Sequence, residues 1–417
     1  MLLKADVIFD AGVQSIMAEY SIPLWEQFDL LYVDSSYGTE SADYELVKSH
    51  LAGYIGKNLE FGNRGWLGLD YAGAKITDIL LATDFNGLDF YLQAVDVVKA
   101  SVGVPYIEQM LTWFDRIDST QNMGDFLESE AADIDKIIED TNGTQVEVKE
   151  AVYEEVDIEN PLDKILSGNI LLRQVIDDYS FVSSENVEAH ELASHRPLAM
   201  GTIQEMREEG SFLDKAFFCK YVTDHFACYR ELRQNESEAL QCELEYLIGG
   251  KSCDAQNLEI VTAKLLLIRQ IDNYLLLLQD GAKKVEAHEI ATAVTAALVP
   301  WMEPVIYQAL LIYWAYEESV QDLQALFKGE SVPLAKSLPL NASDNVSLSY
   351  EEYLFLLLLM QDREHLVMRS IDIIEFSLRK EDTGFRMDAC IGQAHFIGEF
   401  YDRYDKRYTI SGKIQYG

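Results

Sequence analysis

The 417-residue chain has few cysteines, few basic residues and no long apolar run, and each shortage excludes a class of protein. It holds 33 Lys and Arg against 71 Asp and Glu, which gives a net charge of 33 − 71 = −38. A surface this acidic repels phosphate groups, so we expect no nucleic-acid partner and no peripheral basic membrane helix. No segment has the length and hydrophobicity of a membrane span or a signal peptide.

The five cysteines are too sparse for a disulfide scaffold. Cys219 and Cys228 are predicted to share one helix, where a rise of about 13 Å between them prevents a bridge. We therefore expect buried free thiols. A Cys242–Cys253 disulfide across a turn between helices remains an alternative, and the cysteines do not decide the redox compartment.

Hydrophobic residues make up 48% of the chain, which is enough for a substantial core, and the length favours two or three domains. Alternating patterns near both ends predict strands at residues 28–34, 74–83, 385–397 and 408–416. Helical spacing dominates between them. The predicted fold class is therefore α+β, a small sheet of N- and C-terminal strands with a large, mostly helical middle region. We expect residues 1–103 and 383–417 to form a pseudopilin-like sheet domain, and residues 104–382 a helical domain.

Helical periodicity predicts helices at residues 5–27, 42–58, 88–101, 212–248, 257–279, 287–327 and 350–379, with a bend or break near Pro300 and Pro304. An acidic tract at residues 125–160 carries 13 acidic side chains against Lys136 and Lys149. Apolar residues recur in this tract at helical spacing, which predicts a solvated helical hairpin turning at Asn142-Gly143. A disordered acidic linker is the alternative.

Three motifs resemble ligand sites without meeting their requirements. Gly249-Gly250-Lys251-Ser252 imitates a phosphate loop, but Glu245 stands where that loop needs glycine, so a helix C-cap is the better interpretation. His190-Glu191 and His195 imitate a zinc helix, but the two histidines are five residues apart, where four are needed. Residues 84–89 (DFNGLD) lack the closing glutamate of a calcium loop and are predicted to form a turn with an Asx hydrogen bond.

No nucleophile motif is present in the sequence, and carboxylate pairs are too frequent to be informative. Polar residues on otherwise apolar helix faces, namely Arg269, Asp272 and Gln361, predict buried ion pairing. Asp362-Arg363-Glu364 is interpreted as a salt-bridge site inside a helix. The sequence thus assigns no catalytic, cofactor-binding or metal residues, and we expect neither a cofactor nor an enzyme.

The apolar stripe of residues 5–20 begins without an N-cap, as it would if a helix continued from a segment before Lys4. A helix cut just after a membrane anchor has this pattern, and so does an ordinary frayed helix start.

Six collinear segments resemble an uncharacterised Gram-positive family of surface proteins, a domain of unknown function related to the TadE-type minor pseudopilins of tight-adherence pili. They are residues 10–38, 80–103, 194–196 (Ser-His-Arg), 244–273, 315–336 and 348–379. The resemblance implies an N-terminal transmembrane helix that runs into residues 5–27, a span that this sequence lacks. It also implies an extracytoplasmic, cell-surface location and protein partners in a pilus or envelope assembly. It transfers no catalytic residues.

We therefore expect a non-enzymatic, membrane-anchored surface subunit. The alternative is an extracytoplasmic ligand-binding module with a cleft between the sheet and the helical region, and a third hypothesis is a hydrolase with an unrecognised site. The sequence does not indicate the oligomeric state.

Overall fold

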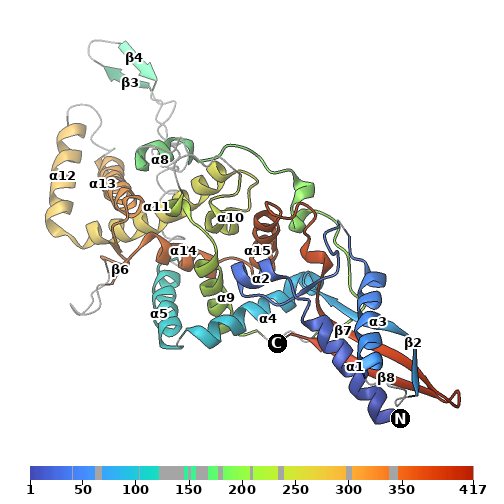
Figure 1. Ribbon diagram of the computed structural model, residues 1–417. Helices are drawn as coiled ribbons and strands as arrows, with labels where there is room; N and C mark the ends of the chain where they lie inside the picture. Colours follow the sequence, from blue (N-terminus) through green and yellow to red (C-terminus); the bar gives the residue numbers. More distant parts are fainter. Residues whose placement is uncertain are drawn as a thin grey trace. The chain divides into compact units, whose positions relative to one another are not determined.

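The computed structural model describes residues 1–39, 41–61, 68–102, 104–121, 145–148, 152–155, 168–176, 182–206, 210–232, 239–296, 303–337 and 346–416 (Figure 1). The chain has the α+β fold predicted from its sequence. Contacts divide it into two compact units: unit 1 is residues 1–107, 186–226 and 360–417, and unit 2 is residues 108–185 and 227–359. These boundaries differ from the predicted domains, because residues 186–226 and 360–382 group with the sheet.

Unit 1 contains a four-stranded antiparallel sheet built from both ends of the chain, as the alternating patterns predicted. β7 (Cys390–Asp402) is the central strand. Each of the other three strands pairs with β7: β1 (Val33–Asp34), β2 (Leu69–Leu81) and β8 (Arg407–Gln415). β7 and β8 pair in unbroken register, whereas the pairing of β2 with β7 has three irregularities, which disrupt the ladder locally.

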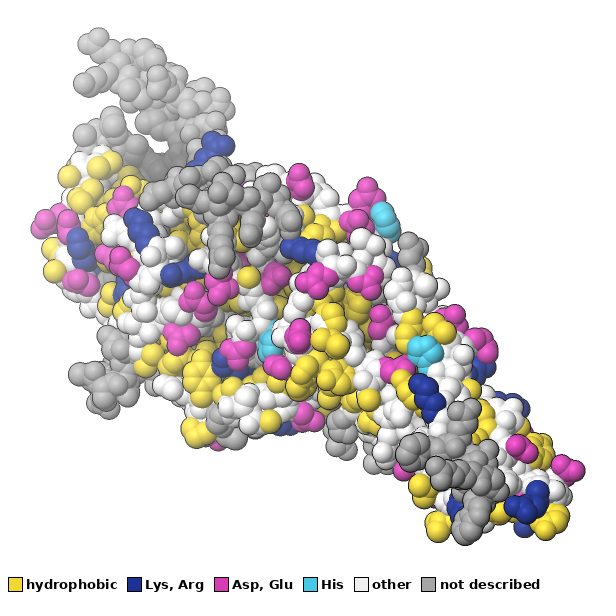
Figure 2. Space-filling view, in the orientation of Figure 1, with side chains coloured by type: hydrophobic (Ala, Val, Ile, Leu, Met, Phe, Trp, Pro, Cys, Tyr) yellow, Lys and Arg dark blue, Asp and Glu magenta, His cyan; other side chains and the backbone are white. Residues whose placement is uncertain are grey.

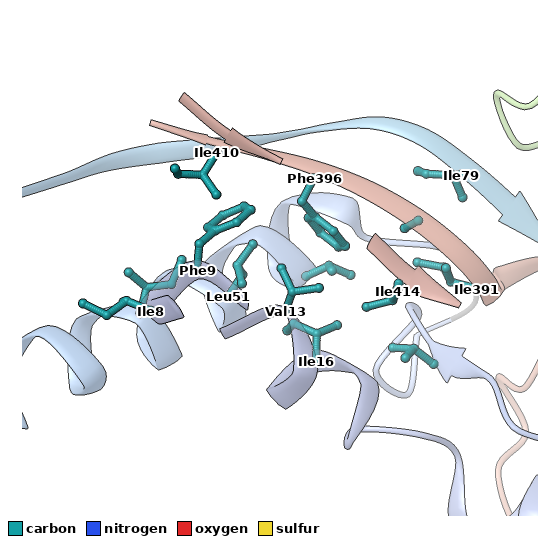
Figure 3. Close-up of a cluster of buried hydrophobic side chains, with 14 of the residues drawn as sticks. Ile8, Phe9, Val13, Ile16, Leu51, Ile79, Ile391, Phe396, Ile410 and Ile414 are labelled. Atoms are coloured by element: carbon teal, nitrogen blue, oxygen red, sulfur yellow. The ribbon is translucent and has the colours of Figure 1, made fainter. Parts of the chain in front are cut away.

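The core of this sheet lies under two helices, α1 (Leu2–Met17) and α3 (Tyr44–Phe61). Alternate residues of β7, such as Phe396 and Phe400, are buried because successive strand side chains point to opposite faces. Figure 3 shows Phe9 and Val13 of α1 directed toward this layer. Glycine is required at position 398, because a Cβ there would lie 2.3 Å from the Phe9 ring.

The other helices of unit 1 are α2 (Ile22–Phe28), α4 (Asp84–Ser101), α9 (Phe212–His225) and α15 (Arg363–Leu378). Short 3₁₀ turns occur at η1 (Ala189–Glu191), η2 (Ala193–His195) and η5 (Met387–Ala389). α5 (Val104–Gln121) begins in unit 1 and continues into unit 2.

Unit 2 is mainly helical. α11 (Asp254–Gln279) packs against α10 (Glu243–Gly249) and α13 (Glu303–Lys328), and α12 (Gly281–Thr295) packs against α13. α8 (Gly168–Val175), η3 (Tyr229–Glu231) and α14 (Tyr350–Leu359) complete its described helices, and β5 (Val332–Pro333) pairs with β6 (Ser347–Leu348).

Several predicted helices are interrupted. Residues 5–27 form α1 and α2, because Pro23 fits only the first turn of a new helix. Residues 350–379 form α14 and α15, because the Asp362 carboxylate accepts a hydrogen bond from His365 N and caps α15. Residues 212–248 form α9 and α10, so Cys219 and Cys228 do not share a helix. The predicted interruption of residues 287–327 separates α12 from α13, and Pro300 lies outside the described residues.

The helical interpretation of the acidic tract is wrong where it can be compared. β3 (Gln145–Val148) and β4 (Val152–Glu155) form an antiparallel pair, consistent with valines that alternate with polar residues, a period-two pattern. The remainder of residues 125–160, including Asn142-Gly143, lies outside the described residues.

The five cysteines are buried and unbridged, as predicted, so the alternative Cys242–Cys253 disulfide does not form. Within the described ranges, no helix combines the length and apolar character needed to cross a lipid bilayer.

Candidate functional site

A concentration of buried charge in unit 1 surrounds Arg196, the last residue of the Ser-His-Arg segment. η2 ends beside α15, so that Arg196 Nη1 and Nη2 donate to the two carboxylate oxygens of Glu375, each at 2.8 Å. Arg196 Nη2 also lies 3.1 Å from Asp388 Oδ1. The Glu375 side chain is fully buried. A two-point arginine–carboxylate contact of this kind fixes orientation as well as charge.

Further groups complete this arrangement, which we call the Arg196 cluster. Ser194 donates from its backbone N and from Oγ to Asp372, at 2.9 and 2.5 Å. Arg379 pairs with Glu375, and Arg386 pairs with Asp388. The cluster thus holds three arginines and three carboxylates, a charge balance of 3 − 3 = 0. Its members are Ser194, Arg196, Asp372, Glu375, Arg379, Arg386 and Asp388.

Protonation in the Arg196 cluster follows these contacts. Burial alone would raise the pKa of Asp388, but hydrogen bonds from Arg386 and from Ala199 N, with the charges of Arg386 and Arg196, lower it overall. Burial would likewise lower the pKa of Arg196, yet Glu375 and Asp388 raise it. Both groups are therefore charged at neutral pH and neutralise each other.

The segment after Arg196 continues along unit 1, and we call residues 193–203 the strap. Ala199 N donates to Asp388 at 2.8 Å, and Gly201 N donates to Asp84 at 3.0 Å. Thr202 N donates to the Ile79 carbonyl, and Ile79 N donates back to Thr202 Oγ1 at 2.8 Å. The strap thus ties β2 and α4 to α15 and to η5, the turn that precedes β7.

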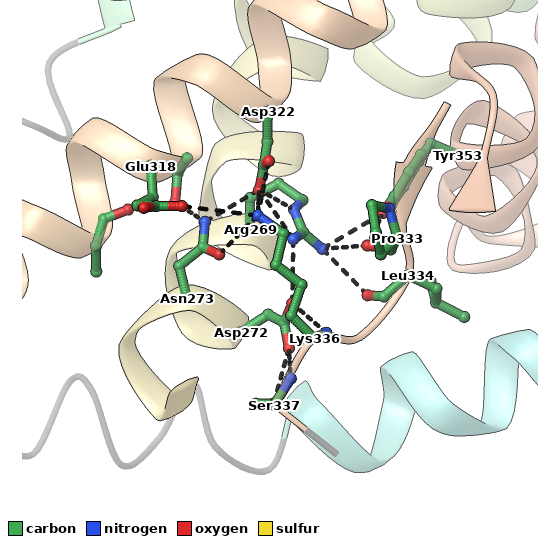
Figure 4. Close-up of polar contacts among 12 residues, drawn as sticks. Arg269, Asp272, Asn273, Glu318, Asp322, Pro333, Leu334, Lys336, Ser337 and Tyr353 are labelled. Atoms are coloured by element: carbon green, nitrogen blue, oxygen red, sulfur yellow. Dashed lines mark hydrogen bonds and ion pairs between the residues drawn. The ribbon is translucent and has the colours of Figure 1, made fainter. Parts of the chain in front are cut away.

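Unit 2 contains a comparable arrangement, the Arg269 cluster (Figure 4). Arg269 is completely buried on α11, and its Nε and Nη2 lie 3.0 and 2.9 Å from Asp322 Oδ2 on α13. Its Nη1 donates to the carbonyls of Pro333 and Leu334 at 2.9 and 3.1 Å. The predicted pairing with Asp272 is confirmed at 3.1 Å.

Residues 333–337 are held to α11 and α13 by the same cluster. Lys336 Nζ lies 2.8 Å from Asp322 Oδ1, and Ser337 donates from N and Oγ to Asp272 Oδ1 at 3.0 and 2.7 Å. Burial would raise the pKa of Asp322, but the charge of Arg269 and the hydrogen bond from Lys336 lower it. In both units, therefore, a buried arginine fixes an irregular segment onto helices.

Glu245 on α10 is a third buried charge-bearing group, and it has no cationic partner in the described residues. Its Oε1 accepts hydrogen bonds from Tyr229 N at 2.9 Å and from Tyr350 OH at 2.7 Å. Burial raises its pKa to about 7, although these hydrogen bonds act in the opposite direction. Its Oε2 is buried and accepts no hydrogen bond from the described residues.

The motifs noted in the sequence contribute no member to the Arg196 and Arg269 clusters, although Asp84 contacts the strap. Gly250 has φ 65° and ends α10, which confirms the helix C-cap. His190 and His195 lie on separate 3₁₀ turns rather than on one helix. Asp84 belongs to the predicted turn, but its carboxylate accepts from Leu81 N and the strap.

Two polar residues differ from their predicted roles. Asp362 precedes α15 as its N-cap instead of lying inside a helix, and its carboxylate lies 3.8 Å from His365 Nδ1. Gln361 lies between α14 and α15 and not on a helix face, and its backbone carbonyl accepts a hydrogen bond from Lys215 Nζ at 2.5 Å. Within the described ranges, no three His, Cys, Asp or Glu side chains gather as a metal-ligand set.

The sequence interpretation missed most members of both clusters. Arg196 stood in the Ser-His-Arg segment, which carried the resemblance but gave no indication of its carboxylate partners. For Asp322 and Lys336, the only signal in the sequence was that each is a charged residue close to apolar ones.

A family model described as a family of unknown function (DUF5702) matches residues 151–400. This interval covers 400 − 151 + 1 = 250 of the 417 residues, more than half of the chain. The chain belongs to this family. No curated protein and no solved structure gives a significant match. The matched interval contains every member of the Arg196 and Arg269 clusters, whereas α1, α3, β1, β2 and β8 lie outside it.

Proposed function

We propose that the protein is a non-enzymatic, membrane-anchored surface subunit of a minor pseudopilin-like kind, serving a tight-adherence pilus or secretion system. The observation that carries this proposal is the packing of α1 on a sheet built from both chain ends. α1 buries Ala5, Phe9, Val13 and Ile16 in that core. A helix that continues from a membrane anchor into a folded domain needs an apolar face that packs on the core of that domain.

The buried charges support a scaffold more than a catalyst. The guanidinium groups of Arg196 and Arg269 bind carboxylates and carbonyls of their own unit, at 3.1 Å or less. Groups held in this way fix the positions of segments, because moving one would leave a buried charge without its partner. The −38 net charge also suits a soluble, exposed face.

Cell fractionation tests the location. The full-length gene product should be recovered with membranes and should be degraded when protease is added to intact cells. A cytosolic protein that is protected until lysis would contradict the proposal and favour the ligand-binding alternative.

Crosslinking in intact cells tests the assembly. We expect covalent adducts with subunits of the pilus or secretion system, and loss of the assembled structure when the gene is deleted. A membrane-bound protein whose deletion leaves every such assembly intact would contradict the role as a subunit.

A further inference from the structure

The start of α1 and the turn between β7 and β8 lie at the same end of unit 1. The Phe9 ring packs against the Gly398 backbone and lies 6.1 Å from the Phe400 ring, so α1 follows β7. From Phe9 to Met1 the helix rises about 12 Å, and from Gly398 to Asp402 the strand advances about 13 Å. Figure 1 shows the N-terminus beside the end of this hairpin.

Large apolar side chains are exposed at this end. Leu3 is 76% exposed and Tyr404, in the turn, is 82% exposed; Met1, Leu2 and Val7 are also exposed. The turn itself is well ordered by hydrogen bonds, because the Asp402 carboxylate accepts from Tyr404 N and Lys406 N at 2.8 and 3.1 Å. Tyr404 is therefore presented outward by a defined backbone.

Basic side chains accompany these apolar groups. Three of the five residues 403–407 are basic and one is acidic, although acidic residues outnumber basic ones 71 to 33 in the whole chain. Lys4, Arg403 and Lys406 are exposed. Figure 2 shows hydrophobic and basic side chains near each other in this part of the surface. Aromatic and apolar groups flanked by Lys and Arg are the combination that membrane interfaces favour.

We propose that residues 1–7 and 403–407, which we call the tip, dock on an anionic lipid surface. Leu3, Val7 and Tyr404 enter the headgroup layer, and Lys4, Arg403 and Lys406 face the lipid phosphates. The acidic remainder of the chain is repelled by the same surface, so contact through the tip also orients unit 1 relative to the membrane. This inference rests on the proposed membrane-proximal function and names the lipid that the protein meets there.

Sedimentation with lipid vesicles tests the tip. The purified chain is mixed at low salt with vesicles of phosphatidylglycerol and phosphatidylcholine in equal amounts, or with phosphatidylcholine vesicles. We expect binding to the anionic vesicles that weakens with salt, and about a tenfold weaker binding for Leu3→Glu/Tyr404→Glu.

The matched control is Met200→Glu/Val294→Glu, which replaces two other exposed apolar residues and makes the same change in net charge. It should bind within about twofold of the unmodified chain. Circular dichroism melts establish that both variants fold.

The tip proposal is overturned if the unmodified chain does not bind anionic vesicles, or if both double variants lose binding equally. It is also overturned if light scattering shows that Leu3 and Tyr404 instead join two copies of the chain. Vesicle binding is measured on the purified chain and location is measured in cells. If the protein is exposed on the cell surface but does not bind vesicles, only the tip proposal is refuted. If the protein is cytosolic, the proposed function is refuted.

Discussion

Arg196 and Glu375 are joined by two hydrogen bonds of 2.8 Å, although 179 residues separate them in the chain. This contact fixes the strap on α15 in a place where Glu375 is fully buried. Losing Arg196 would leave the buried Glu375 carboxylate with Arg379 alone, and losing Glu375 would leave Arg196 with Asp388 alone, so either loss unbalances a buried set of charges.

Replacing Arg196 with methionine should therefore destabilise the fold strongly. We expect Arg196→Met to lower the free energy of unfolding by about 3–5 kcal/mol, measured by urea denaturation. The control is Lys48→Met, which removes an ion pair with the exposed Glu45 and should change stability by about 0.5 kcal/mol or less. Similar losses in the two variants would contradict the structural role of the Arg196 cluster.

Gly201 tests the docking of the strap. A Cβ at this position would lie 2.3 Å from both Asp84 Oδ2 and the Ile79 carbonyl oxygen, and the latter belongs to backbone that cannot easily move. Gly201→Ala should cost about 1–3 kcal/mol in thermal or urea unfolding. Gly53→Ala in α3 meets nothing within 4 Å and should instead stabilise the protein by up to about 1 kcal/mol. If Gly201→Ala were as stable as Gly53→Ala, the strap would not lie against β2.

Glu245 should make the protein less stable as pH rises, whereas a carboxylate in an ordinary ion pair makes a protein more stable as pH rises. Burial raises the pKa of Glu245 from its ordinary value of 4.5 to about 7 in the folded protein. Between these values the folded protein binds more protons than the unfolded chain, so the free energy of unfolding falls as pH rises, by about 3 kcal/mol in all.

Glu245→Gln cannot titrate and should lose this decline, so its stability relative to the unmodified protein should increase from pH 5 to pH 8. Urea denaturation at a series of pH values measures the effect, with the exposed Glu289→Gln as a control that keeps the original profile. Parallel profiles for all three proteins would show that Glu245 does not titrate in this range.

Asp322 predicts the opposite slope at lower pH. The charge of Arg269 and the hydrogen bond from Lys336 outweigh the effect of burial and lower its pKa in the folded protein. The stability that it contributes is present above the unfolded value of about 3.9 and is lost as pH falls through the folded value. Asp322→Asn should be less stable at pH 7 and should lose less on acidification, and an acid transition as steep as that of the unmodified protein would contradict this assignment.

The sheet and its core could be predicted from the sequence because their pattern is local. In β7 and β8 the alternation of residues such as Phe396, Ile410 and Ile414 reports directly which face is buried. The breaks in the long helices could not be predicted as easily, because apolar residues continue at helical spacing on both sides of residues 360–362. There an N-cap, Asp362, decides where the helix restarts.

The clusters were predictable only where both partners lie on one helix. Arg269 and Asp272 are three residues apart on α11, so their pairing could be inferred from the sequence. Asp322 lies 53 residues from Arg269, and Asp372 lies 178 residues from Ser194. Such contacts depend on how the chain folds back on itself, which a single sequence does not reveal by its spacing.

The central claim, that this protein works outside the cell membrane, can be measured with one engineered thiol. All five native cysteines are buried, so they should react poorly with maleimides. Met200 is 84% exposed, so Met200→Cys places one accessible thiol on the surface. In intact cells a membrane-impermeant maleimide should label Met200→Cys, and should leave the unmodified protein unlabelled. Labelling of Met200→Cys only after lysis would contradict the proposed function.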